Sequence, residues 1–268
     1  MKFGVTANPQ IPSAREAAKR IVGLLDRKHE VLIETDLAQS LGASGIALAE
    51  MRPDVLLAVG GDGTILRALQ LSDAIVFGIN SGSLGFLAEA YADEVGVYLE
   101  RIAEGDYRVE ERLRLKVTVD GRRSYDCANE AVVHTAHVAK IRHFEIRVDG
   151  TVAQRVRADG IVIATPTGST SYSMSAGGPI VDPRVDAIMV TAIAPFKPAM
   201  RAYVFPATSE VSVRLVKPRE CLLVLDGQHE FVLKGAEDVV LTGSERRARF
   251  VRFRDDFYRR IEEKLSRQ

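Results

Sequence analysis

Apolar and polar positions repeat with different periods in the two parts of this sequence. In the first part, short apolar runs alternate with stretches in which apolar residues recur every three or four positions. The runs predict strands over 2–7, 29–34, 55–59 and 74–79. The helical spacing predicts helices over 13–28, with Ser13 as N-cap, over 64–71 and over 93–105. Strands that alternate with helices are typical of a parallel sheet with helices on both faces.

From about residue 107 to residue 252 the period changes to two. Apolar and polar residues alternate in RLRLKVTVDGRR, FEIRVDG, EVSVRLV and RRARFVRF, and Asp120-Gly121 has the composition of a hairpin turn. This pattern predicts a predominantly antiparallel, β-rich and sandwich-like domain.

The end of the chain returns to a helical pattern. Phe257, Ile261 and Leu265 recur at intervals of four among charged residues, which predicts an amphipathic terminal helix. We therefore expect an α/β domain over 1–104, a β-rich domain over 105–252, and a segment over 253–268 that packs back on the first domain.

The charge balance gives no reason to expect nucleic acid as a partner, because 36 Lys and Arg residues face 36 Asp and Glu residues. No apolar stretch reaches the roughly 18 to 20 residues that span a bilayer. The N-terminal sequence MKFGV also lacks the apolar region of a signal peptide. We expect a cytoplasmic protein without membrane association, in which Cys127 and Cys221 are reduced structural thiols.

The stretch LLAVGGDGTILRAL places Gly60, Gly61 and Gly63 around Asp62, where a strand turns into a helix. Glycine amides can face phosphate oxygens, and the N-terminus of the helix adds partial positive charge. Phosphate would repel Asp62 unless the carboxylate held a metal or accepted the proton of an incoming hydroxyl. The stretch fits neither a Walker A loop nor G-x-G-x-x-G. It indicates either a tight turn alone or a site for phosphoryl transfer.

A second stretch, TPTGSTSYS from Thr165, concentrates hydroxyl side chains beside Gly177-Gly178. Small polar residues with a single aromatic ring suit an adenine and ribose pocket, although a loop that caps a helix has the same composition. A metal site built from His134, His137 and His143 is disfavoured, because residues three apart in a strand lie on opposite faces.

The GGDGT stretch resembles the signature shared by NAD kinases, diacylglycerol and sphingosine kinases and, more loosely, phosphofructokinases. The segments GINSGSLGFLAE, ANEAVV, ADGIVIATPTGSTSYSMSAGGPIV and LDGQ resemble the NAD kinases in particular, in that family's order along nearly the whole chain. The resemblance implies an N-terminal α/β domain, a β-rich C-terminal domain and a terminal segment that returns to the first.

The resemblance also implies a reaction, in which a phosphoryl group moves from ATP or polyphosphate to the 2′-hydroxyl of the adenosine ribose of NAD. It implies a divalent metal, usually Mg²⁺, and Asp62 as the catalytic base. The implied phosphate-binding residues are Gly60, Gly61, Gly63 and Thr64. The implied substrate-binding residues are Asp62, Gly63, Asn129, Glu130, Arg157, Asp159, Thr170, Ser171, Tyr172, Ser173, Met174, Ser175, Ala194 and Gln228.

Some features stay open. Ser81 and Ser83 occupy a loop that carries Arg or Thr in many relatives. The cations that grip the donor are not singled out among Arg67, Lys140, Arg142, Arg184 and Lys197. A lipid kinase and a non-catalytic dinucleotide-sensing protein are the competing interpretations. The family forms dimers and tetramers through its β-rich domain, and exposed strand edges around 107–150 would be consistent with such pairing.

Overall fold

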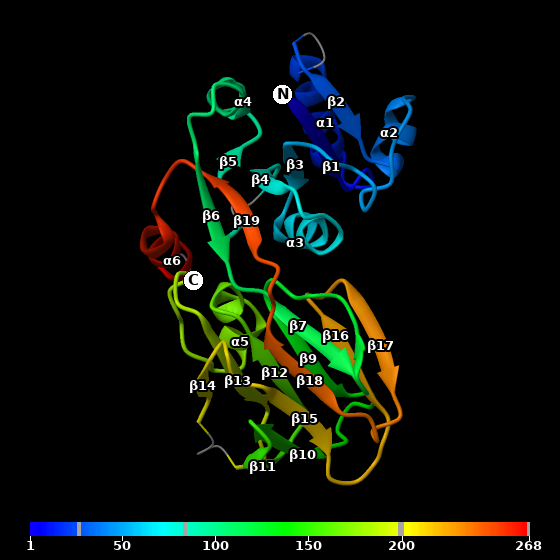
Figure 1. Ribbon diagram of the computed structural model, residues 1–268, viewed down its shortest axis with the longest axis vertical. Helices are drawn as coiled ribbons and strands as arrows, with labels where there is room; N and C mark the ends of the chain where they lie inside the picture. The colour runs from blue at the N-terminus through cyan, green and yellow to red at the C-terminus, as the bar shows by residue number, and fades with distance from the viewer. Residues whose placement is uncertain (26–27, 83–84, 198–200, 267–268) are drawn as a thin grey trace. The chain divides into compact units, whose positions relative to one another are not determined.

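The chain forms two units, which Figure 1 shows as a computed structural model. Unit 1 contains Met1–Glu111 and Ala248–Gln268, and unit 2 contains Arg112–Arg247. The structure describes residues 1–25, 28–82, 85–197 and 201–266. It divides the chain at 111/112 and 247/248, whereas the change of period in the sequence placed the divisions at 104/105 and 252/253.

Unit 1 is built on one sheet in the order β2-β1-β3-β4-β19-β6, with β5 paired to β4. The pairs β1/β2, β1/β3, β3/β4, β4/β5 and β4/β19 are parallel, as predicted for the α/β domain. The strands are β1 (Lys2–Ala7), β2 (Glu30–Ile33), β3 (Val55–Gly60), β4 (Ile75–Asn80), β5 (Ala90–Tyr91), β6 (Arg108–Arg112) and β19 (Ala248–Arg252).

The helices of unit 1 are buried to different extents, from five buried residues in the first helix to Arg260 alone in the last. They are α1 (Pro12–Leu25), α2 (Thr35–Leu41), α3 (Asp62–Leu71), α4 (Val95–Ala103) and α6 (Phe257–Leu265). Ser13 was expected as the N-cap of the first helix, but α1 already includes Pro12, whose fixed φ suits a first helical position. The short helix α2 has no long apolar periodicity and was not predicted.

One strand lies in a different sheet from the one we predicted. We expected the alternating segment RRARFVRF in the antiparallel domain, but β19 pairs in parallel with β4 through Phe250 and Val76. Val251 is fully buried in the core of unit 1. Alternation predicts that a segment is a strand, but it does not say which sheet the strand joins.

Unit 2 consists of two six-stranded sheets, in the orders β11-β10-β15-β18-β7-β8 and β14-β13-β12-β9-β16-β17. Neighbouring strands within each sheet are antiparallel. The strands are β7 (Leu115–Val119), β8 (Arg122–Arg123), β9 (Glu130–Thr135), β10 (Arg142–Val148), β11 (Thr151–Ala158), β12 (Gly160–Ala164), β13 (Ala187–Ile193), β14 (Tyr203–Pro206), β15 (Val211–Leu215), β16 (Cys221–Leu225), β17 (His229–Leu233) and β18 (Val239–Gly243).

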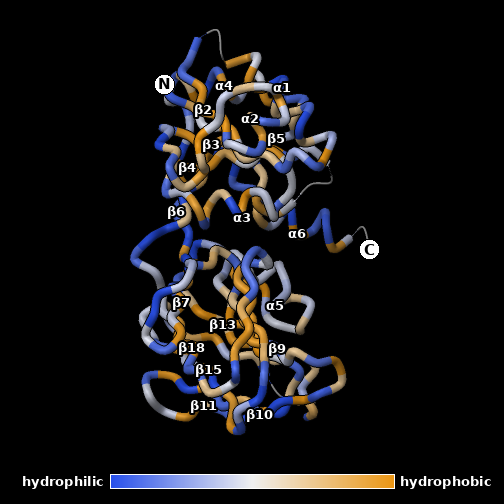
Figure 2. The backbone as a smooth tube through the Cα atoms, turned by 90° about the vertical axis from the view of Figure 1, so that its right-hand side faces the viewer, coloured by the Kyte–Doolittle hydropathy of each residue, from blue (hydrophilic) through white to orange (hydrophobic). Residues whose placement is uncertain are grey.

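Both sheets of unit 2 contribute to a shared hydrophobic core. Phe144 and Val213 from one sheet pack in the same cluster as Ile161 and Leu223 from the other. Figure 2 shows this as hydrophobic stretches along the strands. The β-rich, sandwich-like class predicted from the period of two is confirmed.

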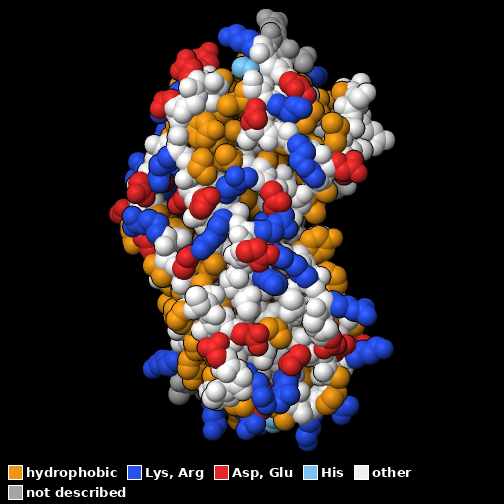
Figure 3. All heavy atoms as spheres, in the orientation of Figure 1, with side chains coloured by type: hydrophobic (Ala, Val, Ile, Leu, Met, Phe, Trp, Pro, Cys, Tyr) orange, Lys and Arg blue, Asp and Glu red, His pale blue; other side chains and the backbone are white. Residues whose placement is uncertain are grey.

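The two cysteines belong to this interior as free, buried thiols. Burial raises the pKa of the Cys127 thiol well above its usual range and that of Cys221 to about 11. In the described part of the chain, every helix is too short or too polar to cross a membrane. Figure 3 shows cationic and anionic side chains interspersed over the visible face, in keeping with the balanced charge.

Candidate active site

The glycine–aspartate turn of unit 1 is tighter than the sequence predicted. Helix α3 begins at Asp62 and not at Thr64, so Asp62 and Gly63 belong to its first turn. An acidic residue is favourable there because it faces the positive end of the helix dipole. Gly60 has φ +155°, and a Cβ on it would lie 2.5 Å from Thr64 Oγ1, so the turn requires glycine at this position.

The carboxylate of Asp62 is held by the backbone that follows Gly85. Asp62 Oδ2 accepts the N–H of Phe86 at 2.8 Å, and Oδ1 accepts the N–H of Leu87 at 3.1 Å. A Cβ on Gly85 would lie only 1.9 Å from Asp62 Oδ1, so this close approach depends on glycine. Asp62 remains partly exposed, which leaves its carboxylate accessible to a substrate. Sequence reasoning singled out Asp62 but not Gly85.

A cation also lies near this carboxylate. Lys264 of α6 places its Nζ 3.9 Å from the ring centroid of Phe86. Burial lowers the pKa of Lys264, and the charge of Asp62 acts in the opposite direction. The pattern of the terminal helix predicted its apolar side and gave no sign of this lysine.

Arg67, one of the candidate donor cations, is engaged within unit 1. It pairs with Glu34, a buried residue that follows β2, and the Nη1-to-Oε2 distance is 3.1 Å. The hydrogen bond to Glu34 raises the pKa of Arg67, and Thr6 also donates to Glu34. In the nearby loop, Ser81 donates its N–H to Gly60 O at 3.4 Å, and Ser83 lies outside the described residues.

In unit 2, Asn129 and Glu130 lie at the start of β9, and each is 7% exposed. The carboxylate of Asp226 accepts the N–H groups of Ala128 at 2.7 Å, of Asn129 at 2.8 Å and of Glu130 at 3.0 Å. Asp226 forms the hairpin turn between β16 and β17 together with Gly227, and its φ is +50°. The sequence predicted this turn, but nothing in an Asp-Gly pair signals the anchoring role of its carboxylate.

The hydroxyl-rich stretch binds the same backbone segment. Thr165 donates its hydroxyl to Ala128 O at 2.6 Å and its N–H to Asn129 O at 2.8 Å. A Cβ on Gly168 would lie 2.3 Å from Asn129 O, which explains the glycine in this loop. The loop continues as η1 (Thr167–Thr170) and α5 (Tyr172–Ser175), and Ser171 donates to Glu130 Oε1 at 3.1 Å.

Two acceptor atoms of this cluster have no hydrogen-bond partner among the described residues. They are Asn129 Oδ1 and Glu130 Oε2, and both are buried. Burial and then the charge of Asp226 raise the pKa of Glu130 to about 8. Burial likewise raises the pKa of Asp226 to about 6, against the effect of its three backbone donors. Buried polar atoms are normally satisfied, so these two favour a ligand at this position.

The other predicted substrate-binding residues differ in exposure. Thr170 and Ser173 are buried, Met174 is partly buried, and Ser175 is exposed. Tyr172 is 40% exposed, so its ring is available for stacking.

The remaining predicted substrate-binding residues are distributed over unit 2. Arg157 stacks its guanidinium over the Phe196 ring at 4.5 Å, and both line a cavity of about 520 Å³ with Lys197. Asp159 joins β11 to β12 and is partly buried. Ala194 is exposed with φ +45°, and the exposed Gln228 directly follows the Asp226 turn.

The remaining candidate cations have neighbours within unit 2. Arg142 Nη1 donates to Lys140 O at 3.1 Å, and Arg184 pairs with Asp182 at 2.6 Å. His134 places its Nδ1 2.8 Å from Thr135 O. No group of three or more His, Cys, Asp or Glu side chains suited to a metal ion occurs within the part of the chain that is described.

Family models match both parts of the chain. One described as the ATP-NAD kinase N-terminal domain matches residues 3–107, and one described as the ATP-NAD kinase C-terminal domain matches residues 128–253. The NAD kinase of Thermoplasma volcanium is 43% identical over 266 residues, which cover 99% of this chain and 98% of the relative. The NAD kinase of Methanothermobacter thermautotrophicus is 41% identical over 273 residues, which cover 99% and 96%.

Solved structures share the fold. The crystal structure of an NAD kinase from Archaeoglobus fulgidus in complex with ATP has a TM-score of 0.81 and 30% identity, over 99% of both chains. Yeast NADH kinase complexed with NADH has a TM-score of 0.91 over 99% of this chain and 87% of its own, at 24% identity. The motif-based resemblance and the fold class it implied are thereby confirmed.

Proposed function

The chain belongs to the NAD kinase family, and from this premise we propose that it transfers the γ-phosphoryl group of ATP to the 2′-hydroxyl of the adenosine ribose of NAD. The observation that carries the proposal is the placement of Asp62, a partly exposed carboxylate at the start of α3 whose two oxygens are oriented by backbone N–H groups. The family match favours this reaction over the phosphorylation of a lipid.

Asp62 serves as the general base. The 2′-hydroxyl oxygen forms a bond to the γ-phosphorus, the bond from that phosphorus to the bridging oxygen breaks, and ADP leaves. The hydroxyl proton moves to a carboxylate oxygen of Asp62, which accepts one N–H and has further acceptor capacity. Phosphate oxygens are bound at Gly60, Gly61, Gly63 and Thr64, at the N-terminus of α3, where the partial positive charge of the helix favours an anion.

Unit 2 supplies residues that bind NAD. Asn129 Oδ1 and Glu130 Oε2 are directed to donors of the dinucleotide, because they are buried and have no partner among the described residues. The segment from Thr170 to Ser175 encloses the adenosine, with Tyr172 available to stack on the adenine. Arg157, Asp159, Ala194 and Gln228 provide further contacts. The names of the relatives and the family models support NAD as the substrate.

A divalent metal, Mg²⁺ by preference, accompanies the donor. Mg²⁺ in kinases commonly keeps several waters and binds through one or two carboxylates together with substrate phosphates. In that mode the phosphates of the donor and water would supply most of the ligands, which leaves Asp62 available as the base. The described residues hold no cluster of three or more His, Cys, Asp or Glu side chains that would enclose the ion. When bound, the metal would neutralise phosphate charge. Polyphosphate stays a second candidate donor, whereas the ATP complex of the Archaeoglobus fulgidus relative favours ATP.

The protein further forms a homodimer or homotetramer through unit 2. Strand β17 is the edge of its sheet and leaves Phe231 37% and Val232 65% exposed. An edge strand with exposed apolar side chains is suited to pairing with another chain. Light scattering coupled to gel filtration measures the oligomer, and the change Val232→Lys should weaken it if β17 is the contact.

The reaction is tested by incubating the purified chain with Mg²⁺, NAD and either ATP or polyphosphate, followed by mass spectrometry. A product heavier than NAD by one phosphate establishes the reaction, and the donor that yields it is identified at once. Saturable binding of NAD without product from either donor would instead indicate a dinucleotide-sensing protein. Absence of both product and binding would contradict the proposal.

A further inference from the structure

Residues 86–89 connect the carboxylate of Asp62 to the C-terminal part of unit 1. The N–H groups of Phe86 and Leu87 bind Asp62, as described above. Leu87 and Ala88 are almost fully buried, and the N–H of Glu89 donates to Gly78 O of β4 at 2.8 Å. The orientation of Asp62 therefore depends on what holds this short segment in place.

Two buried arginines hold it from the other side. Arg252, the last residue of β19, donates to Leu87 O at 2.9 Å, and Arg260 of α6 donates to Ala88 O. Leu87 thus gives its N–H to Asp62 and its carbonyl to Arg252. Arg252 and Arg260 are 4% and 6% exposed, so their hydrogen bonds form largely away from water.

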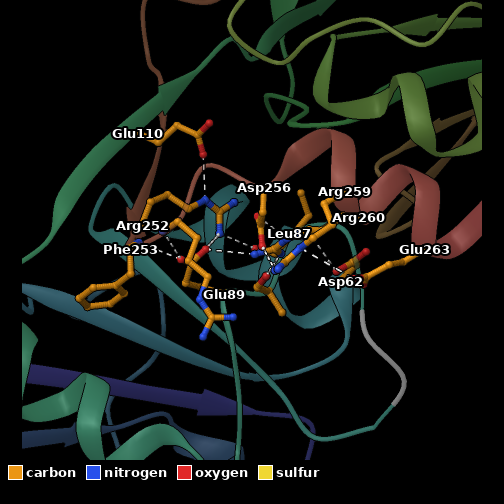
Figure 4. Close-up of polar contacts among 12 residues, drawn as sticks. Asp62, Leu87, Glu89, Glu110, Arg252, Phe253, Asp256, Arg259, Arg260 and Glu263 are labelled. Atoms are coloured by element: carbon orange, nitrogen blue, oxygen red, sulfur yellow. Dashed lines mark hydrogen bonds and ion pairs between the residues drawn. The ribbon is translucent and has the colours of Figure 1, made fainter.

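Acidic side chains keep both arginines in position. Glu89 lies 3.1 Å from Arg252 Nη1 and 3.3 Å from Arg260 Nη2, and it also accepts the N–H of Phe253 at 2.8 Å. Asp256 Oδ1 accepts a hydrogen bond from Arg260 Nε at 2.7 Å. Figure 4 shows these side chains pointing toward one another beside Leu87. A buried ion-pair network costs desolvation and is not by itself a source of stability, so its presence here favours a role in specifying geometry.

We propose that Arg260 and Arg252 are positioning residues for Asp62, which act through the backbone of residues 86–89 to orient the catalytic carboxylate. The inference rests on the proposed function, because it takes Asp62 as the base. Neither arginine contacts the reacting atoms in this role. In this role the terminal helix α6 fixes the backbone segment that orients the carboxylate.

Arg259 provides a matched control for Arg260. It is the preceding residue of the same helix, its side chain is 58% exposed, and it pairs with Asp256 at 3.2 Å and Glu263 at 3.8 Å. In the full chain, Arg260→Ala should lower kcat for NAD phosphorylation by about tenfold to a hundredfold, because small misplacements of catalytic groups carry losses of this size. KM for NAD should stay within about twofold, and Arg259→Ala should keep the wild-type kcat.

Two further readouts separate positioning from general damage. Millimolar guanidinium should restore part of the kcat of Arg260→Ala and none of that of Asp62→Asn. Hydrogen–deuterium exchange of a peptide covering 86–89 should accelerate in Arg260→Ala, while peptides from β1 and α1 stay protected. If Arg260→Ala does not fold, Arg260→Lys keeps the charge without the paired geometry and should show an intermediate loss of kcat.

The outcomes distinguish this inference from the proposed function. A folded Arg260→Ala variant with wild-type kcat and unchanged exchange at 86–89 would overturn the positioning role. Parallel changes in kcat and KM without guanidinium rescue would also overturn it. A wild-type chain that forms no NADP overturns the proposed function instead, and the exchange measurement then decides alone whether Arg260 holds the segment.

Discussion

Asp62 and Asp226 are two aspartates whose carboxylates both accept backbone N–H groups, yet their surroundings differ. Asp62 in unit 1 accepts two and remains partly exposed, whereas Asp226 in unit 2 accepts three and is 4% exposed. The first arrangement orients a carboxylate that a substrate can reach. The second uses a carboxylate to shape the backbone that presents Asn129 and Glu130. In the proposed function, the same hydrogen-bonding pattern thus serves chemistry in one unit and ligand binding in the other.

The largest effect should come from removing the charge of Asp62. The change Asp62→Asn keeps the shape of the side chain but abolishes its capacity as a base, so kcat should fall by about a hundredfold or more. KM for NAD should change little, because the amide keeps a hydrogen-bonding group for the 2′-hydroxyl and most of the proposed NAD contacts lie in unit 2. Initial rates of NADP formation at varied NAD measure both quantities. Undiminished turnover would remove Asp62 from the role of base.

A methyl group at Gly85 should have the next largest effect. The Cβ of Gly85→Ala would lie 1.9 Å from Asp62 Oδ1, so the carboxylate must move from its two N–H donors. We expect kcat to fall by about tenfold to a hundredfold, which is less than for the loss of the base itself. Gly82→Ala is a control in the same loop, since nothing lies within 4 Å of its added Cβ. Equal kinetics for the two variants would argue against the close approach at Gly85.

The change Asp226→Asn should affect binding more than turnover. An amide retains one acceptor oxygen for the three N–H groups and introduces a donor that faces them, which leaves buried groups unpaired. We expect KM for NAD to rise about tenfold and the free energy of unfolding to fall by about 1–3 kcal/mol. Kinetics and urea unfolding measure the two effects. A wild-type KM with a lowered kcat would contradict the proposal that Asp226 serves binding and Asp62 serves turnover.

The last expected effect is a pH dependence of stability that traces to Glu130. Its pKa is about 8 in the folded chain, against an ordinary value of 4.5, so the folded state binds the proton more tightly than the unfolded state does. The stability of the ligand-free protein should therefore decrease as the pH rises from 4.5 toward 8.

The change Glu130→Gln removes this titration. Thermal unfolding of both chains between those pH values measures the dependence, and the Tm of the variant should vary less with pH. Asp226, with a pKa of about 6, adds a slope of the same sign at the acidic end in both proteins. Identical pH profiles would show that Glu130 does not titrate as described.

Much of the fold was predictable because local pattern and packing agree. The buried runs of β3 and β4 have helices between and after them, and the alternation from β7 onward matches antiparallel pairing. The placement of β19 was not predictable, because its pairing with β4 joins residues far apart in the sequence. Asp62, Asn129 and Glu130 were singled out from the sequence because they lie in contiguous motifs, and their roles stay predictions.

The supporting residues were not found, for a physical reason. Asp226 looks like an ordinary turn residue, and its function depends on a segment almost a hundred positions earlier in the chain. Gly85 is one glycine in a glycine-rich loop. Its importance is visible only in the structure, where an added Cβ would lie 1.9 Å from Asp62 Oδ1. Arg252 and Arg260 resemble surface charges in the sequence but are buried. Long-range contacts of this kind leave no local pattern.

The most direct test of the comparison is one steady-state experiment on Asp62→Asn and Asp226→Asn beside the wild-type chain, with NADP formation followed at varied NAD. The account predicts that Asp62→Asn loses kcat at nearly unchanged KM, and that Asp226→Asn raises KM with a smaller loss of kcat. Retention of wild-type kcat by Asp62→Asn, in an assay where the wild-type chain makes NADP, would contradict it.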